Sequence, residues 1–247
     1  MPCHGDSLLR HARTGRGGCH ALLARSDGRR DLAQTVDGKR LLRRCNYLTL
    51  DVEDVAELPP DRDEYSYGTV SPDHRYYAVS VRPPQGGPSQ VHLLDLEANR
   101  WSVLLDKPGY HAKHEQFSRD GRNRVLIQLN QMPDVKVVLL SELEIGGTEK
   151  PFPADRPYTL RPTGHEAWIG QTSSIFFSTG WNAAAKGNVW SAKVGVDKPA
   201  LVHEGKRFGH VSVSRDRLLL FFAGRDSVSE FGLFESLDRV FSFHLDD

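Results

Sequence analysis

Two histidines, His114 and His210, stand at the same position ahead of a repeated turn. Each lies six residues before an aspartate, Asp120 or Asp216, that belongs to a Ser-x-Asp turn. Imidazole is a ligand of Zn, Cu, Fe and Ni ions, and a shell that also contains carbonyl or carboxylate oxygen suits Mn as well. Equivalent histidines of a repeat can therefore form a metal site if the fold brings their positions together.

A third histidine, His165, joins this set when strands rather than turns are aligned. It stands twelve residues before Phe177, the spacing that also separates His210 from the end of the strand that follows it. Gln116 follows His114 by two residues, so the two-residue period of a strand places both side chains on one face. The candidate metal ligands are therefore His114, Gln116, His165 and His210.

Other side chains near this set have more than one interpretation. A single histidine is more often a hydrogen-bonded structural residue than a ligand, and both interpretations stay open for the whole set. His111 lies outside the shared position and is a candidate catalytic residue at the mouth of the site. Tyr67 takes the shared position in an earlier unit and is a candidate for substrate binding. Trp168 either packs between sheets or offers a ring on which a sugar stacks. Glu115 and Glu166 alternate to the other side of the strand and are expected as outer partners of the ligands.

The repeated turn also predicts the fold. Ser/Thr-x-Asp turns at Asp37, Asp73 and Asp120 are 36 and 47 residues apart, and Asp216 follows after 96, which is two periods around a degenerate unit. A period of about 45 residues is typical of a four-stranded propeller blade. Runs such as 89–106 indicate two short strands joined by a turn. We expect an all-β fold, a β-propeller of four-stranded blades with about five units, which is an incomplete ring.

Local patterns predict the domain bounds and leave an alternative fold open. Residues 1–30, rich in Arg and Gly, are expected to form a poorly ordered tail or remnant, and residues 31–247 the propeller domain. A β-sandwich or two small β domains would also show turns every 8–12 residues or so. The apolar spacing of residues 227–241 suits a short amphipathic helix.

Composition argues against several classes of partner. The chain of 247 residues carries 32 basic and 32 acidic residues, so no global field favours nucleic acid or an anionic membrane. No apolar run approaches the roughly 18 residues of a membrane span. The odd set of Cys3, Cys19 and Cys45 gives neither a disulfide framework nor paired metal-ligand spacing, which predicts free thiols and a cytoplasmic location.

Three segments resemble, in order and spacing, the oligogalacturonate lyase family and the lyase-like propeller proteins of TolB type. They are "HEQFSRDGRNRVLIQ" (114–128), "PYTLRPTGHEAWIGQTSSIFFST" (157–179) and "RFGHVSVSRD" (207–216), within a resemblance that covers roughly residues 65–222. The resemblance implies a seven-bladed propeller with manganese held by His and Gln in the central channel. It also implies β-elimination on galacturonate oligomers, as in pectin degradation. By the resemblance, the four candidate ligands fall on positions of the metal-centre motifs.

The sequence departs from that family at a place that matters for chemistry. Lyase-type members carry a histidine just after the strand that follows the "HxQF" segment, whereas this chain has Leu129 and Asn130 there. The family chain also continues past the last segment into another His-bearing blade. We therefore expect a divalent metal, Mn²⁺ first, and an acidic oligosaccharide or other small ligand in the channel, with lyase activity left open. The alternatives are a non-catalytic TolB- or WD-like binding or scaffold propeller, and an inactive fragment of a longer enzyme.

Overall fold

The fold consists of β-strands throughout the part of the chain that can be described. The computed structural model describes residues 29–46, 48–59, 63–64, 68–83, 85–135, 137–154, 163–179, 187–205, 208–213, 220–224, 230–236 and 239–244. Within these ranges no helix occurs, and none is therefore long or apolar enough to cross a membrane. The expected tail lies almost wholly outside the described residues, although Arg29 and Arg30 already belong to the first strand.

The strands pair into antiparallel sheets that follow one another along the chain. The first sheet contains β1 (Arg29–Val36), β2 (Lys39–Asn46) and β3 (Val52–Glu57). The second contains β4 (Asp63–Glu64), β5 (Thr69–Val70), β6 (Tyr76–Arg82), β7 (Gln90–Asp95) and β8 (Arg100–Leu105). The third contains β9 (Tyr110–Phe117), β10 (Arg124–Gln131), β11 (Val138–Glu144) and β12 (Glu149–Pro151). The fourth contains β13 (Thr163–Trp168), β14 (Ser174–Thr179), β15 (Gly187–Lys193) and β16 (Ala200–Gly205).

Four further strands follow as two antiparallel pairs. They are β17 (Phe208–Val213) with β18 (Leu220–Gly224), and β19 (Glu230–Ser236) with β20 (Arg239–His244). Because β18 also contacts β19, these strands stand where a fifth four-stranded unit would be. The helix expected at 227–241 is wrong: the segment forms the β19–β20 hairpin, in keeping with the preference of its aromatic residues for strands.

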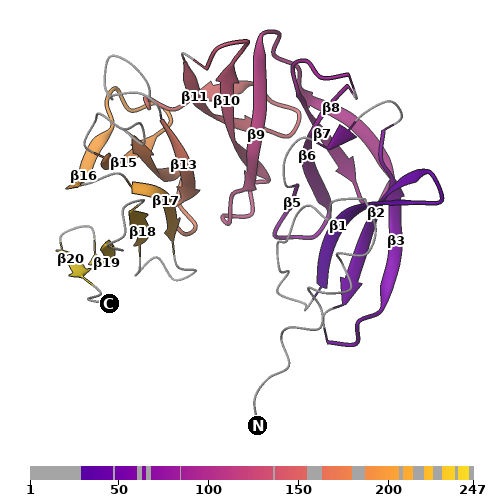
Figure 1. The fold of residues 1–247 in the computed structure, drawn as a ribbon, viewed down its shortest axis with the longest axis horizontal. Helices are drawn as coiled ribbons and strands as arrows, with labels where there is room; N and C mark the ends of the chain where they lie inside the picture. The colour runs from indigo at the N-terminus through magenta and orange to yellow at the C-terminus, as the bar shows by residue number, and fades with distance from the viewer. Residues whose placement is uncertain are drawn as a thin grey trace.

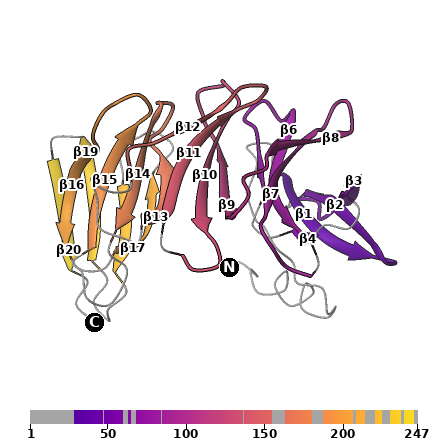
Figure 2. The same ribbon diagram turned by 90° about the horizontal axis from the view of Figure 1, so that it is seen from above.

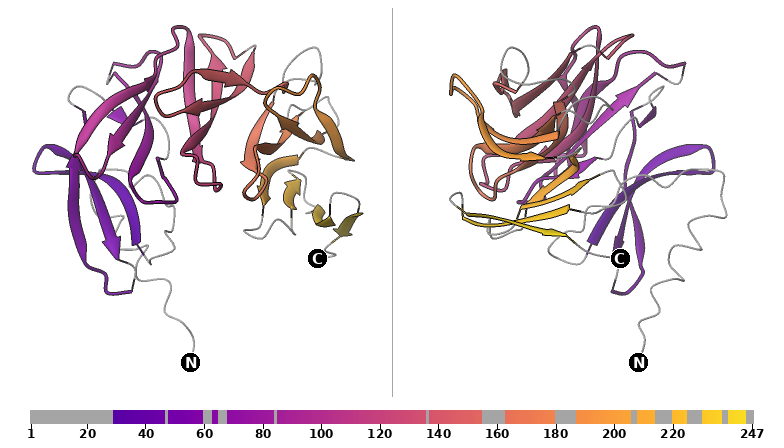
Figure 3. Two further views of the ribbon diagram at one scale, coloured as in Figure 1. Left: turned by 180° about the vertical axis from the view of Figure 1, so that it is seen from behind. Right: turned by 60° about the vertical axis from the view of Figure 1, so that its left-hand side comes forward.

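The sheets are arranged around an arc (Figure 1). Strand β5 contacts β9 and strand β13 contacts β17, and these strands lie on the inner side of the arc. Seen from above, the sheets stand side by side along the arc, and the views from behind and from the side agree (Figures 2 and 3). Strands β1 and β20 lie on either side of an opening, so the described sheets do not close into a ring. The expected all-β fold of four-stranded blades is confirmed, and the sandwich alternative is wrong.

Hydrophobic side chains fill the spaces between neighbouring sheets. Strand β10 is buried along nearly its whole length because both of its faces are covered. Ile127 and Leu129 pack against the second sheet, and Leu126 packs against Trp168 and its neighbours in the fourth. Such burial stabilises the fold by roughly 1.5–3 kcal/mol for each fully buried large aliphatic side chain.

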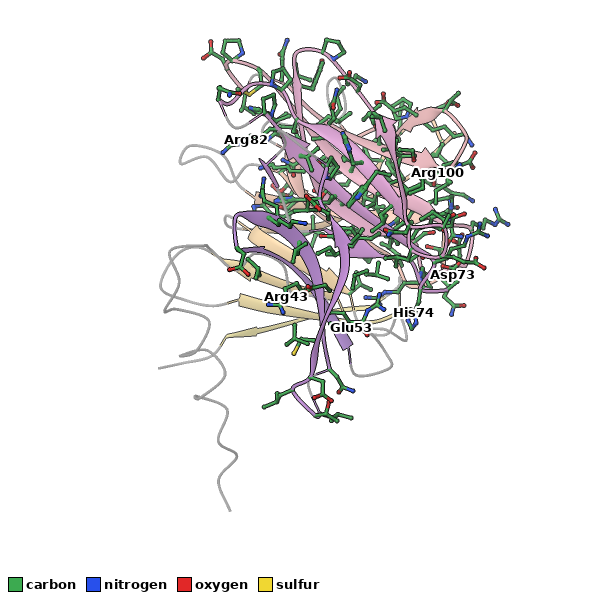
Figure 4. The ribbon with its side chains drawn as sticks, turned by 90° about the vertical axis from the view of Figure 1, so that its right-hand side faces the viewer. Arg43, Glu53, Asp73, His74, Arg82 and Arg100 are labelled. Carbon is green, nitrogen blue, oxygen red and sulfur yellow. The ribbon has the colours of Figure 1, made fainter. Side chains whose placement is uncertain are left out.

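The Ser-x-Asp turns form the same hydrogen-bonded structure in two successive sheets. Asp73 Oδ1 accepts from the Ser71 hydroxyl at 2.5 Å and from the Arg75 backbone N–H at 3.1 Å. Asp120 Oδ1 accepts from the hydroxyl and backbone N–H at equivalent positions, at 2.7 and 3.1 Å. The side-chain amide of Asn123 donates to Asp73 at 3.0 Å and so joins the two turns. Asp73 lies at the opposite end of the second sheet from Arg82 (Figure 4). The repeated aspartate is thus a structural turn residue.

These turns predict that the protein loses stability in acid. Burial raises the pKa of Asp73 and of Asp120, but hydrogen bonds outweigh it and leave both pKa values lower than normal. The folded chain therefore binds fewer protons than the unfolded chain near pH 4. The stabilisation is complete above the unfolded pKa of about 4 and is lost as the pH falls through the lower folded values.

The double variant Asp73→Asn, Asp120→Asn should unfold at a lower temperature than the wild type at pH 7, and this difference should shrink below about pH 4. Thermal unfolding across the pH range measures it. Asp197→Asn, in an exposed turn, is the control and should follow the wild type. A difference in unfolding temperature that is the same at every pH would contradict a stabilising role for the two charged carboxylates.

Candidate metal centre

The first strands of the third and fourth sheets contain a bulge at the same place. In β9 the residues His114 and Glu115 together face the single residue Ile127 of β10. In β13 the residues His165 and Glu166 together face one residue of β14. Both histidines have a positive φ, 61° and 51°, a region uncommon outside glycine in which histidine is enriched. Bulges of this kind re-aim side chains and are over-represented next to active sites.

The bulge changes which side chains of β9 share a face. Lys113 lies directly opposite Gln128 on β10, and Gln116 lies directly opposite Leu126. Leu126 and Gln128 are two residues apart on a regular strand and so point the same way, toward the fourth sheet. Lys113 and Gln116 therefore share that face, although regular alternation would send residues three apart to opposite sides.

The imidazole rings of His114 and His165 come close to one another at the junction of the two sheets. Their centroids lie 6.1 Å apart with the rings inclined at 45°. This separation lets both rings reach one ion between them, since metal–nitrogen bonds are about 2 Å long. The side chain of His114 is 35% exposed, so its ring is reachable from solvent.

His210 lies on the next first strand, β17, beside a further register shift between Phe208 and His210. Its backbone belongs to the described part of the chain, but its side chain does not. Among the side chains that are described, no three of His, Cys, Asp or Glu gather closely enough to hold a metal ion. The expected set reaches three imidazoles only through His210, so the complete ligand set stays a prediction.

Glu166 lies behind the His114 ring. Its side chain is fully buried, and its Oε1 lies 3.6 Å from Nδ1 of His114. Within the described structure neither of its carboxylate oxygens accepts a hydrogen bond. Burial lowers the pKa of His114, but the adjacent Glu166 carboxylate outweighs burial and raises that pKa overall. A carboxylate at Nδ1 orients the ring and leaves Nε2 for an ion, which is the usual outer arrangement of a metal-bound histidine.

The side chain of Gln116 is oriented by the neighbouring sheet. Its Nε2 donates to the backbone oxygen of Glu166 at 2.7 Å, and the Trp168 indole donates to the backbone oxygen of Gln116 at 2.9 Å. The amide nitrogen thus makes a hydrogen bond between the sheets, and the amide oxygen is the atom that Gln116 can offer to an ion.

Trp168 is a packing residue in this structure. It is 4% exposed, lies in the hydrophobic cluster between the third and fourth sheets, and contacts Phe152 edge to face. The guanidinium of Arg124 lies 5.2 Å from the centre of its ring. A sugar could not stack on this ring without displacing these contacts, which is a correction to the stacking interpretation. Tyr67, the other candidate for substrate binding, is outside the described residues.

His111 lies near the start of β9, directly opposite Asn130 of β10. Both are buried, with 7% and 8% of their surface exposed. Burial, followed by the positive charges of Arg82 and Lys113, lowers the pKa of His111. The candidate catalytic residue is therefore uncharged at neutral pH. It faces Asn130, which stands at the position where the resemblance to the lyases leads us to expect a histidine.

Comparisons with known proteins agree in fold but not in sequence. No protein-family model and no curated protein matches the chain. A solved oligogalacturonate lyase in complex with manganese is similar, with a TM-score of 0.68 and 14% identity over 86% of this chain and 61% of that one. An oligogalacturonate lyase from Vibrio parahaemolyticus has a TM-score of 0.64 and 11% identity, again over 86% of this chain and 61% of that one. TolB from Acinetobacter baumannii has a TM-score of 0.62 and 9% identity over 89% of this chain and 52% of that one.

These likenesses establish the fold. At 9–14% identity the similarity extends to chain architecture, and this chain spans about three-fifths of the length of the two lyases, as the 61% coverage states. The similarity to oligogalacturonate lyases and TolB-type propellers that the sequence motifs indicate is therefore confirmed at the level of structure. The described sheets have the fold of a β-propeller.

The contact between Glu166 and His114 predicts a measurable change in the metal-free protein. Because the carboxylate raises the pKa of His114, the variant Glu166→Gln should titrate His114 at lower pH than the wild type. Histidine resonances followed by NMR across the pH range measure this. Glu97→Gln, at an exposed turn, is the control and should leave His114 unchanged. An unaltered His114 titration in Glu166→Gln would rule out the contact.

Proposed function

We propose that this chain is a metal-binding propeller of the oligogalacturonate lyase type that acts on uronate-containing oligosaccharides by metal-assisted β-elimination. The observation that carries the proposal is the meeting of His114 and His165, equivalent residues of adjacent bulged strands, with a buried carboxylate behind the first ring. The similarity in fold to a lyase solved with manganese supports the same conclusion.

The side chains fit a divalent ion. His114 and His165 offer ring nitrogens, Gln116 offers an amide oxygen, and His210 is proposed as the third imidazole. A mixed set of nitrogen and oxygen donors suits Mn²⁺, which we place first. Glu166 would act one step further out, by orienting His114.

The proposed reaction needs a charge stabiliser and a base. A divalent ion held by these residues would neutralise the substrate carboxylate and stabilise the negative charge that develops beside it. We assign His111 to accept the proton from the carbon next to that carboxylate. The released electron pair forms a carbon–carbon double bond as the bond to the glycosidic oxygen breaks, and that oxygen takes a proton from water.

A specific observation favours a second candidate, a non-catalytic propeller that binds the same sugars. Asn130 stands where the family pattern calls for a histidine, and its side-chain oxygen accepts a hydrogen bond from Gln128 Nε2 at 2.7 Å. Asn130 is therefore held as a structural residue. Binding of galacturonate oligomers without any unsaturated product would favour this candidate.

Manganese binding tests the metal centre. Titration of the metal-free protein with Mn²⁺, followed by electron paramagnetic resonance, should show one tight site. His114→Ala and His165→Ala should each weaken it more than about a hundredfold, because loss of an outer partner alone costs about 10–100-fold. His203→Ala, on β16, is the matched control and should bind as the wild type does. Wild-type protein without a tight site, or variants that keep it, would refute the proposal.

The role of His111 predicts a pH profile and a selective loss of activity. A base works when unprotonated, and the pKa of His111 is lowered from about 6.5. Product formation, followed by the ultraviolet absorbance of the unsaturated uronate, should therefore stay level through neutral pH and fall only in acid. His111→Gln should lose about 10²–10⁴-fold in rate while keeping its Mn²⁺ affinity. Full activity in that variant would exclude His111 as the base.

A further inference from the structure

In the described structure, a cationic side chain beside the candidate metal centre contacts no anion directly. Lys113 is half-buried on the face of β9 that meets the fourth sheet. In the described part of the chain it makes neither a hydrogen bond nor an ion pair, although the charges of Glu166, His111 and His114 act on it from a longer range. A partly desolvated ammonium group without a contacting anion is a suitable binding group for one.

A buried acceptor lies directly across from this lysine. Gln128 pairs in register with Lys113 and is 5% exposed. Its Nε2 donates to Asn130, whereas its Oε1 is buried and receives no hydrogen bond within the described structure. A buried acceptor without a donor destabilises the protein, so this oxygen calls for a group that can donate to it.

Glycine at position 164 leaves room for that acceptor. A Cβ placed on Gly164 would lie 2.9 Å from Gln128 Oε1, closer than real Cβ atoms come to another atom. Gly164 belongs to β13, immediately before His165. The absence of a side chain there lets Gln128 point at the fourth sheet beside the candidate metal ligands.

We propose that Lys113, Gln128 and Gly164 form a subsite for a hydroxy acid, in which Lys113 binds the carboxylate of an acidic sugar and Gln128 Oε1 accepts a hydrogen bond from a neighbouring hydroxyl. The choice of galacturonate as that sugar rests on the proposed function. Lys113 directly precedes His114, so the subsite adjoins the metal centre. A ligand with acid groups on successive sugars can engage both places at once.

Charges of both signs lie around the subsite. Lys113 and Arg82 both act as positive charges on His111, at the same end of β9. The opposing charges are those of Glu166, which is buried 3.6 Å from His114, and of Glu115, which is buried and accepts a hydrogen bond from Ser80. A competing role for Lys113 is therefore to balance Glu166 alone, and the experiment must separate the two roles.

Calorimetric titration with the galacturonate trimer and with the uncharged galactose trimer, with and without Mn²⁺, provides that separation. Lys113→Met should bind the galacturonate trimer about 10- to 100-fold more weakly than the wild type, as expected for loss of a charged hydrogen bond. Its affinity for the galactose trimer, its Mn²⁺ affinity and its thermal stability should stay unchanged. Lys113→Arg should restore most of the loss, and Lys198→Met, at an exposed turn, should behave as the wild type.

A second variant tests the acceptor. Gly164→Ala crowds Gln128 Oε1 and should weaken the binding of both trimers, because it affects the hydroxyl rather than the carboxylate. The proposal is overturned if the wild type binds no galacturonate trimer, or if Lys113→Met binds it as the wild type does. It is also overturned if Lys113→Met loses thermal stability and Mn²⁺ affinity while its preference for the galacturonate trimer over the galactose trimer stays the same. Lys113 would then only balance the charge of Glu166.

The outcomes for the subsite and for the proposed function are distinguishable. If the protein binds no Mn²⁺ and forms no product, yet loses galacturonate binding in Lys113→Met, the subsite is supported and the lyase activity is contradicted. If the Lys113→Met variant catalyses elimination at the full rate, the lyase activity is supported and the subsite is contradicted.

Discussion

A one-residue bulge in each of the strands β9 and β13 decides which side chains meet between the third and fourth sheets. Each bulge begins at a histidine with positive φ and places two residues opposite one. On a regular strand, Lys113 and Gln116 would lie on opposite faces. The bulge puts both on the face toward the fourth sheet, where His114 meets Glu166. Without it, the candidate ligands, the carboxylate behind them and the lysine beside them would not share one place.

The remainder of the interface holds these polar groups in position. On β10, Leu126 joins the hydrophobic cluster around Trp168, while Gln128 and Asn130, further along the same face, are polar. The apolar part stabilises the contact between the sheets, and the hydrogen bonds between Gln116 and the strand of Trp168 fix the register across it. In the described structure this polar row keeps one buried acceptor, Gln128 Oε1, without a donor.

The sequence predicts the architecture better than it predicts the site. Asp73 and Asp120 reveal the repeat because a Ser-x-Asp turn needs a carboxylate at a fixed position, and the structure shows that hydrogen bonding in both turns. The shared position of His114 and His165 is likewise visible in the spacing. The face on which Lys113 lies is not, since strict alternation assigns it to the wrong side. The bulge falls within the polar segment 113–116, where no apolar residue reveals the shift in alternation. The apolar residues of the β19–β20 hairpin fit both the helical and the strand period over a short run, so their spacing alone does not separate a helix from a strand.

The carboxylates that follow the histidines make the candidate centre asymmetric. Each reaches back to the preceding sheet: Glu115 accepts from the hydroxyl of Ser80, and Glu166 lies against His114. The residue after His210 is Val211, so the next unit cannot offer a carboxylate to His165 from that position. A carboxylate at Nδ1 makes an imidazole a stronger donor. For His114 the fold supplies such a carboxylate, that of Glu166, from the neighbouring sheet.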